Sequence, residues 1–477
     1  MSKKTPPRFD LSRLAEDLSE VFGDRLSSIQ AIREQHGRDE SAHPMAAPDL
    51  VVFALTTDEV SAAVKVCAAH KAPIIAFGAG TSLEGQVHAY QGGVSIDLSR
   101  MNGVIEVHPE DMDVTVEAGV TRLQLETYLR DTGLFFPVDP GADATLGGMA
   151  ATGASGTTTL RYGAMRENVM AAKVVMADGS IVEVGGRSRK SSAGYDLMHL
   201  MIGSEGTLGI ITELTLRLYG RPETVASGVC AFSSISDMVD AVTLAIQSEI
   251  PLGRIELLDE VAIFAVNHFS GLENEVAPTL FLEFQGTDAS VAEDIRRFEE
   301  IASEFGGKGF EASTSQDGRN RLWRARHDAL NAGKAFNPGK MGLITDVCVP
   351  VSRLAECIAA TRKDFEDTGL IAAFVGHVGD GNFHTTIWVE PDDEAAIDLA
   401  HEVIARMAQR AISMDGTCTG EHGIGVGKIK YLEAEHPTSL PVMRAIKAAL
   451  DPNNILNPGK IFSGTSPANK ALRGDKI

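Results

Sequence analysis

The sequence predicts an α+β protein of two or three domains, and three observations support this fold class. The chain has 477 residues, 44% hydrophobic and 23% charged, which is enough for more than one buried core. From residue 49 to about 222, apolar strand-like runs alternate with helical patterns and are joined by glycine-rich connections. After Arg221-Pro222 the glycine-rich texture ends, and strands and helices of ordinary spacing follow to about residue 389. We therefore expect an N-terminal helical segment (1–45), a first α/β domain (46–222), a second domain (223–430), a C-terminal helical segment (431–462) and a disordered tail (463–477).

The first half of the chain shows its elements in a clear order. Leu11, Leu14 and Leu18 follow helical spacing and predict an amphipathic helix near the N-terminus. A buried strand is expected at 50–55, and Thr57 then opens a helix. Further strands are expected at 73–77, 94–98, 114–118 and 214–218.

The second half contains a predicted β-hairpin. The β-rich runs 372–375 and 386–389 flank Gly379-Asp-Gly-Asn382, whose residue types suit a tight turn. Other elements are expected at 280–284 (strand), 394–414 (helix) and 441–450 (the last folded element).

Charge and cysteine usage limit the possible functions. The net charge of -22 and the pI near 5.0 argue against a general nucleic-acid binder, because no basic surplus is present to neutralise phosphate. Five scattered cysteines fit a reducing compartment and exclude a Cys-x-x-Cys zinc ribbon and a ferredoxin-type cluster. No apolar run has the length of a membrane span, and no apolar segment follows the first residues. We expect a cytoplasmic protein, with peripheral attachment at the inner membrane left open, and no transmembrane segment.

Three glycine-rich segments mark the first domain. In Phe77–Gly85 the backbone amides can form a nest for phosphate, although Leu83 stands where a nicotinamide fingerprint needs glycine. Residues 138–156 contain almost no large side chains over a dozen positions, so the backbone can approach a large flat ligand. A third segment, 203–212, adds more glycines before a strand. Three such loops suit a long dinucleotide; the alternatives are a plain turn in the first segment and tight helix-to-sheet packing in the second.

Two histidines and an acidic residue form a candidate metal set. His377 and His384 bracket the hairpin turn, and an antiparallel turn would make them cross-strand neighbours. Glu421 follows in Gly420-Glu-His-Gly423, and two imidazoles plus one carboxylate are a common open-sided set for a divalent metal. Zinc or manganese is expected first, with iron and cobalt also compatible. The alternative is a pair of hydrogen-bonded structural histidines.

These segments resemble the FAD-binding domain of the vanillyl-alcohol-oxidase/p-cresol-methylhydroxylase flavoprotein superfamily. The C-terminal half resembles its branch of D-2-hydroxy-acid dehydrogenases and is most similar to the FAD-linked D-lactate dehydrogenases. The resemblance covers roughly Arg33 to Phe462. It is carried by two histidine motifs, the first at 377–384 and the second at 420–425, and by the segments 33–40, 77–85, 323–327 and 345–350.

The resemblance implies a two-subdomain α/β FAD-binding domain, an antiparallel-sheet cap domain for the substrate, and a C-terminal segment that returns to the flavin. Thr81 and Ser82 stand where family members with covalent flavin often carry a histidine, so we expect non-covalent FAD. The expected cofactor-binding residues are Phe77, Gly78, Ala79, Gly80, Thr81, Ser82, Gly85, Pro140, Asp143, Thr145, Gly148, Thr152, Ser155, Gly156, Glu205, Gly206, Gly209, Ile211 and Asn457.

The implied activity is oxidation of a small D-2-hydroxy acid, D-lactate to pyruvate first, by hydride transfer to flavin N5. Electrons would pass to a cytochrome, a quinone or an electron-transfer flavoprotein. Arg326 is expected to hold the substrate carboxylate, with Arg324 in a surface or phosphate role, because a guanidinium fork matches a carboxylate. His422 is expected to be the general base, the alternative being a buried structural histidine. Glycolate, D-2-hydroxyglutarate and a non-redox flavoenzyme of the same superfamily remain the competing interpretations.

Overall fold

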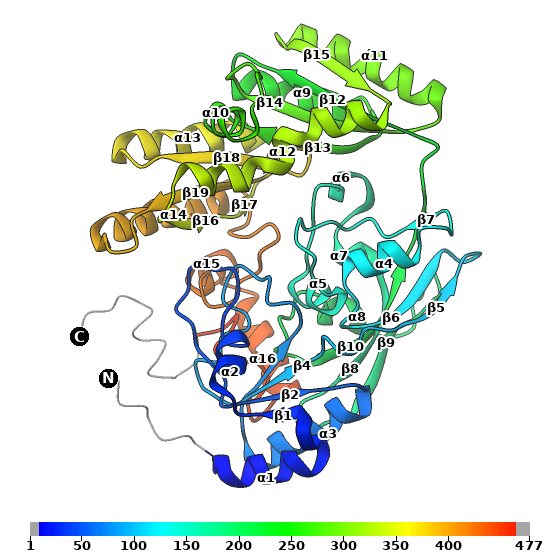
Figure 1. Ribbon diagram of the computed structural model, residues 1–477, viewed down its shortest axis with the longest axis vertical. Coiled ribbons are helices and arrows are strands. Elements are labelled where there is room, and N and C mark those ends of the chain that lie inside the picture. The colour runs from blue at the N-terminus through cyan, green and yellow to red at the C-terminus, as the bar shows by residue number, and fades with distance from the viewer. Residues whose placement is uncertain (1–8, 464–477) are drawn as a thin grey trace. The chain divides into compact units, whose positions relative to one another are not determined.

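The computed structural model describes residues 9–463, which divide into two compact units (Figure 1). Within the described residues, unit 1 comprises 9–155, 164–220 and 421–463, and unit 2 comprises 156–163 and 221–420. All but the first residue of the tail expected to be disordered lies outside the described residues.

The first sheet of unit 1 has the order β1-β2-β4-β3, in which β2, β4 and β3 run parallel and β1 pairs antiparallel at the edge. The helices α1 and α3 lie side by side next to this sheet (Figure 1). Their apolar faces share one core with the strands, because Leu14, Leu18 and Val64 are fully buried there. The elements are α1 (Leu11–Phe22), β1 (Leu26–Ser27), α2 (Gln30–Gln35), β2 (Leu50–Phe53), α3 (Thr57–His70), β3 (Ile74–Phe77) and β4 (Val94–Asp97).

The second sheet of unit 1 is antiparallel, with the order β5-β6-β10-β8-β9, and a two-stranded ribbon joins β7 to β11. Its core is lined by valine and leucine side chains from both sheet and helices. The elements are β5 (Val104–His108), β6 (Asp113–Glu117), α4 (Arg122–Tyr128), β7 (Leu134–Phe135), α5 (Leu146–Thr152), α7 (Met165–Asn168), β8 (Val169–Val175), β9 (Ile181–Gly185), α8 (Leu197–Met201), β10 (Ile210–Arg217), β11 (Tyr219–Gly220), α15 (Ile429–Glu435) and α16 (Leu440–Leu450).

Unit 2 is built on an antiparallel sheet of order β15-β12-β14-β13-β18-β19-β16, with β17 paired to β19. Its largest core contains Phe284, Phe298, Phe374 and Phe383, all buried between sheet and helices. The elements are α6 (Thr159–Tyr162), β12 (Thr224–Ala231), α9 (Ile235–Gln247), β13 (Leu252–Leu258), α10 (Glu260–Ser270), β14 (Thr279–Gly286), α11 (Asp288–Glu304), β15 (Lys308–Ser313), α12 (Gln316–Phe336), β16 (Met341–Ile344), β17 (Val347–Cys348), α13 (Leu354–Thr368), β18 (Ala372–His377), β19 (Asn382–Val389) and α14 (Glu394–Ser413).

The structure confirms the α+β class, the N-terminal helix and the hairpin, and it moves some boundaries. The N-terminal segment 1–45 is not separate, since Leu14 and Leu18 belong to the core of unit 1. Residues 421–430, expected in the second domain, belong to unit 1, and residues 156–163 belong to unit 2. The segment 323–327, one of those that carry the resemblance, lies in the middle of α12.

Two further observations concern the whole of the described chain. All five cysteines are free thiols. Across residues 9–463, no helix combines the length and the apolar composition needed to cross a membrane.

Candidate functional site

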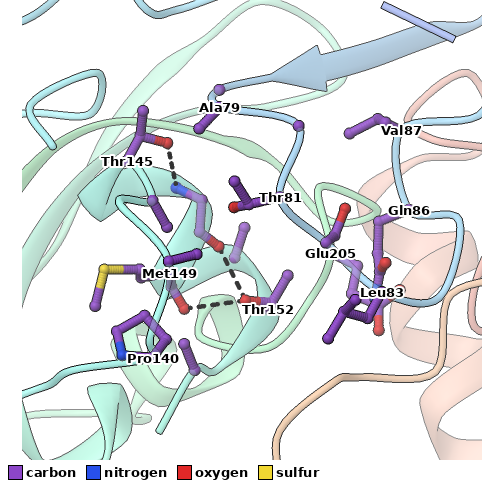
Figure 2. Close-up of a pocket in the computed structure, with 18 of the residues that line it drawn as sticks. Ala79, Thr81, Leu83, Gln86, Val87, Pro140, Thr145, Met149, Thr152 and Glu205 are labelled. Carbon is purple, nitrogen blue, oxygen red and sulfur yellow. Dashed lines mark hydrogen bonds between the residues drawn. The ribbon is translucent and has the colours of Figure 1, made fainter. Parts of the chain in front are cut away.

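A cavity in unit 1 is lined by segments that lie far apart in the sequence (Figure 2). It encloses about 1000 Å³ of empty space, open solvent at its mouth included. The lining comes from parts of all three glycine-rich segments, from two adjacent residues of the second histidine motif and from the C-terminal segment. The predicted cofactor-binding residues that line it are Gly78, Ala79, Gly80, Thr81, Ser82, Pro140, Thr145, Gly148, Thr152, Ser155, Glu205, Gly206 and Asn457.

The small residues of the second segment serve both packing and the cavity. Gly147 packs against Ala118, and a Cβ at Gly147 would lie 2.6 Å from the Ala118 Cβ. Gly148 faces the cavity instead, and its amide donates to Thr145 Oγ1 at 3.3 Å, which caps the N-terminus of α5. Thr152 Oγ1 donates back to the Gly148 carbonyl at 3.1 Å (Figure 2). Tight packing therefore explains Gly147, while its neighbours shape the cavity wall.

The first glycine-rich loop runs from β3 along the cavity. Gly80 has a φ of +68°, a left-handed conformation that favours glycine. Ser82 is tied to the protein by its hydroxyl, which donates to Asp39 Oδ2 at 3.1 Å. Phe77 does not line the cavity, because its ring packs on His36 with centroids 4.3 Å apart.

Five other predicted cofactor residues also lie elsewhere. Gly85 faces Val426 and His43, and Asp143 accepts a hydrogen bond from the Leu123 amide at 3.0 Å. Ile211, in β10, is a core residue. Gly209, in the turn before β10, packs so closely that a Cβ on it would meet Val174. Gly156 belongs to unit 2. These five residues do not line the cavity, and their contact with FAD stays a prediction.

Glu205 is the one acidic residue of the third segment at the cavity, and it is buried. Its carboxylate accepts hydrogen bonds from the amides of Ile424 at 2.6 Å and Gly425 at 2.8 Å. Burial raises the pKa of Glu205 to about 7, although the two amides and the Lys460 charge favour the ionised form. A buried carboxylate with these partners holds two chain segments together.

The C-terminal segment reaches the cavity through Asn457. Its side-chain amide donates to the backbone carbonyls of Gln86 at 3.0 Å and Glu205 at 2.7 Å. Lys460, also buried, donates to the His88 carbonyl at 2.6 Å, and burial lowers the pKa of Lys460 to about 8.

Glu421 and His422 also line this cavity. Ser155 Oγ donates to Glu421 Oε2 at 2.6 Å, which links the second glycine-rich segment to the second histidine motif. Gln86 Nε2 donates to the His422 carbonyl at 2.8 Å. The cavity thus places a carboxylate and an imidazole beside the predicted phosphate loops. This proximity could not be predicted from local sequence patterns, because Ser155 and Glu421 are 266 positions apart.

The two hairpin histidines lie together in unit 2. The register pairs His384 with Val375 and His377 with Asn382, so the two histidines are diagonal cross-strand neighbours, which confirms the expected proximity. Their ring centroids are 5.5 Å apart. His377 Nδ1 lies 2.6 Å from Glu256 Oε1, and His384 Nδ1 lies 3.0 Å from the Thr345 carbonyl.

Glu256 is the functional candidate that sequence analysis missed. It is fully buried on β13, and Arg326 donates to its Oε2 through Nε at 2.9 Å and Nη2 at 2.7 Å. Burial alone would raise the pKa of Glu256, but the His377 and Arg326 charges and hydrogen bonds keep it below its usual range. A single acid within the apolar strand Leu252–Leu258 was the available signal. Arg324 is instead exposed, 3.6 Å from Asp328, which fits a surface role.

Comparison with known proteins covers almost the whole chain. A model of the C-terminal domain of FAD linked oxidases matches residues 221–461, and a model of an FAD binding domain matches residues 48–185. The probable mitochondrial D-lactate dehydrogenase of Danio rerio is 51% identical over 95% of this chain and 93% of its own length. The mitochondrial D-lactate dehydrogenase [cytochrome] of Arabidopsis thaliana is 45% identical (94% and 80%), and the glycolate oxidase subunit GlcD of Bacillus subtilis is 32% identical (94% and 96%).

Solved structures show the same fold. A p-cresol methylhydroxylase with bound substrate superposes with a TM-score of 0.75 at 18% identity, covering 98% of both chains. An alkyldihydroxyacetonephosphate synthase gives 0.74 at 21% identity, covering 95% of this chain and 86% of that one. These matches confirm the expected superfamily fold, with its FAD-binding domain and antiparallel-sheet domain.

The expected cytoplasmic location is wrong, because the Danio rerio and Arabidopsis thaliana relatives are both named as mitochondrial proteins. Composition and cysteine usage were the basis of that expectation. Composition and cysteine usage cannot distinguish between two compartments that both contain proteins with free thiols. The two matched domains and the relatives that align along nearly the full length agree, and the chain belongs to the family of FAD-linked oxidases.

Proposed function

We propose that this chain catalyses the FAD-dependent oxidation of a small D-2-hydroxy acid, D-lactate first, to the 2-oxo acid. The observation that carries the proposal is the cavity of unit 1, which is lined by the glycine-rich segments and also by Glu421 and His422. A cofactor pocket with acid–base side chains in its wall suits oxidation better than binding alone. The names of the Danio rerio and Arabidopsis thaliana relatives support D-lactate as the substrate.

The residues around the cavity fit FAD. The wall consists largely of glycine, alanine, serine and threonine, which allow the backbone to approach a flat ring system and offer donors to phosphates. Thr81 and Ser82 offer no side chain of the kind that links flavin covalently, so we propose non-covalent binding. Bound FAD would accept the hydride that leaves the substrate α-carbon.

Two side chains have separate tasks in this proposal. His422 takes the proton of the substrate hydroxyl, so that the O–H and α-C–H bonds break while the C=O bond forms. Arg326 holds the substrate carboxylate. Its Nε and Nη2 are committed to Glu256, so a substrate carboxylate would bind on the Nη1 side of the guanidinium.

We also propose a divalent metal held by His377, His384 and Glu421. Each histidine has its Nδ1 engaged by a carboxylate or a carbonyl, so Nε2 would serve as the ligand, which is the usual arrangement around metal-ligating histidines. Gly420 lies against β19, since a Cβ there would meet the Asn382 amide nitrogen at 2.3 Å, and Glu421 is bonded directly to Gly420. The ion would supply a positive charge that lowers the pKa of the substrate hydroxyl.

Anaerobic reduction of the bound flavin by a substrate panel tests the proposal. D-Lactate should bleach the flavin absorbance, and L-lactate should not. Glycolate is the second candidate, because the Bacillus subtilis relative is named as a glycolate oxidase subunit. Faster bleaching by glycolate or D-2-hydroxyglutarate would move the assignment to that acid. A flavin that no 2-hydroxy acid bleaches would remove the proposal.

For the electron acceptor we propose a cytochrome, because the Arabidopsis thaliana relative carries that word in its name. After reduction by D-lactate, the flavin should be reoxidised by oxidised cytochrome c faster than by a soluble quinone at equal concentration. The reverse order would favour a quinone, and reoxidation by electron-transfer flavoprotein alone would favour that partner.

A further inference from the structure

The turn Glu421–Gly425 is fixed from both sides by pocket-lining side chains of unit 1. On one side, Gln86 Nε2 donates to the His422 carbonyl at 2.8 Å. On the other, the two oxygens of Glu205 accept the amides of Ile424 at 2.6 Å and Gly425 at 2.8 Å. The backbone from His422 to Gly425 is therefore bound at three polar groups, the His422 carbonyl and the amides of Ile424 and Gly425.

The turn fits these partners too closely to admit a side chain at Gly423 or Gly425. Gly423 has a φ of +80°, and a Cβ on it would lie 2.5 Å from Glu205 Oε1 and 2.9 Å from Gln86 Nε2. Gly425 has a φ of +48°, and its Cβ would lie 2.0 Å from the Glu84 carbonyl. The close approach of Glu205, Gln86 and Glu84 thus explains the glycines at 423 and 425.

Glu205 and Gln86 are themselves held in place. Both backbone carbonyls accept from the same side chain, Asn457 Nδ2, and Gln86 Oε1 accepts the Glu84 amide at 3.0 Å. Glu205 adopts a φ of +51°, which is uncommon for a residue with a side chain and persists where surrounding contacts enforce it. The Glu205 carboxylate as acceptor and the Gln86 side-chain amide as donor are therefore both held in place, and together they can set the orientation of the turn.

We propose that Glu205 and Gln86 are positioning residues that fix the turn Glu421–Gly425 so that the His422 imidazole is held at the flavin pocket. The proposal rests on the role of His422 as base given above. Glu205 is suited to this task because a carboxylate offers two acceptors to two amides. In Glu205→Gln one oxygen becomes an NH₂ group, which would face an amide donor instead of accepting from it.

A double-mutant cycle in stopped-flow flavin reduction tests this proposal, with His422→Ala as the second change. Glu205→Gln alone should lower the limiting rate of flavin reduction by about 10- to 100-fold, the scale expected for a misplaced catalytic group, with the substrate Kd little changed. In the His422→Ala background, Glu205→Gln should cause no further loss, because it acts only through His422. Asp113→Asn is the matched control, since Asp113 is a fully buried carboxylate of unit 1 outside the cavity wall; it should reduce at the wild-type rate.

The outcomes separate this proposal from the proposed function. An equal loss from Glu205→Gln in both backgrounds would show a general structural role and overturn the positioning role. No loss from Glu205→Gln, with a large loss from His422→Ala, would overturn it while the base assignment stands. A wild-type rate in His422→Ala would remove the base assignment and the positioning role with it. If Glu205→Gln fails to retain FAD, Gln86→Met must show the same cycle; this change removes the donor to the His422 carbonyl together with the acceptor of the Glu84 amide.

Discussion

Glu421 and His422 are neighbours in the chain, and both side chains line the cavity of unit 1, yet the proposal gives them different tasks. His422→Ala removes the base and leaves both the metal ligands and the glycine-rich loops in place. We expect this variant to retain metal and FAD and to lose roughly 10²–10⁴-fold in the rate of flavin reduction by D-lactate, measured by stopped flow. If it reduces its flavin at the wild-type rate, the base is elsewhere, and His401 and His327 are the next residues to test.

Arg326 donates to Glu256 and, in the proposed function, also binds the substrate carboxylate. Arg326→Lys keeps the charge near Glu256 but loses the planar fork, so it should raise KM for D-lactate roughly 10-fold or more, with a smaller effect on kcat. Steady-state assays with a dye acceptor measure both constants. Arg324→Lys is the matched control, because Arg324 is exposed on the same helix, and its KM should not change. A fall in kcat with an unchanged KM would place Arg326 outside carboxylate binding.

The metal prediction can be tested independently of flavin binding. His384→Ala should lose the bound metal and most turnover while the flavin absorbance stays intact, because the flavin pocket is lined entirely by residues of unit 1. Elemental analysis of the purified protein gives the metal content, with the exposed His268 changed to alanine as the control. Full metal content in His384→Ala would remove His384 from the ligand set.

Secondary-structure elements explain why these side chains are held firmly. The hairpin of β18 and β19 carries both histidines on a sheet that is buried on the side of Phe374 and Phe383. The strand β13, which carries Glu256, ends at Leu258, and Asp259 follows it directly as the N-cap of α10. Asp259 accepts the Ala262 amide at 2.9 Å and so caps the helix.

The contribution of Asp259, the N-cap of α10, to folding stability depends on pH. Burial, together with the Glu260 charge, raises the pKa of Asp259 to about 7, against the Ala262 and Phe374 backbone contacts and the Arg362 charge, which favour the ionised form. An unfolded aspartate titrates near pH ~4. Between about pH 4 and 7 the folded state therefore binds more protons at this residue, and its contribution to stability falls as pH rises.

Asp259→Asn keeps a capping side chain without the titration. The Tm of this variant relative to wild type should therefore rise from pH 4 to pH 8, measured by thermal unfolding across the range. Asp237→Asn at α9, whose partners are its own helix-start serines, serves as the control and should show no such trend. A Tm difference that stays constant with pH would show that Asp259 ionises normally in the folded protein.

On the scale of the whole molecule, we expect FAD to bind in the cavity of unit 1 and to be released without bond cleavage. Acid precipitation should leave a yellow supernatant, because Thr81 and Ser82 stand where a linking histidine is expected in proteins with covalent flavin. FAD added back to the apoprotein should raise its Tm, since a ligand that binds only the folded state stabilises it. Flavin that remains in the pellet would contradict non-covalent binding, and a colourless protein that takes up no FAD would contradict the flavoprotein assignment.

The sequence by itself determined the elements whose signals are local. Helical spacing and capping residues located α1, α3 and α14, and turn chemistry located the hairpin that carries His377 and His384. The glycine-rich segments predicted a dinucleotide pocket because small residues permit close approach whatever the rest of the fold. Resemblance of the motifs, rather than periodicity, supplied the family and the expected activity.

Only the tertiary structure decided which of these residues meet. Glu256 appeared in sequence as one acid in an apolar strand, and its pairing with Arg326 and His377 depends on contacts 70 and 121 positions away. Phe77 and Ile211 belong to predicted cofactor segments yet pack inward, because the strand direction at those positions points them to the core. The contacts of Glu205 and Gln86 with the His422 turn likewise join segments more than 200 positions apart. Such contacts are set by chain topology, since hydrogen bonds between distant segments leave no periodic signal in the sequence.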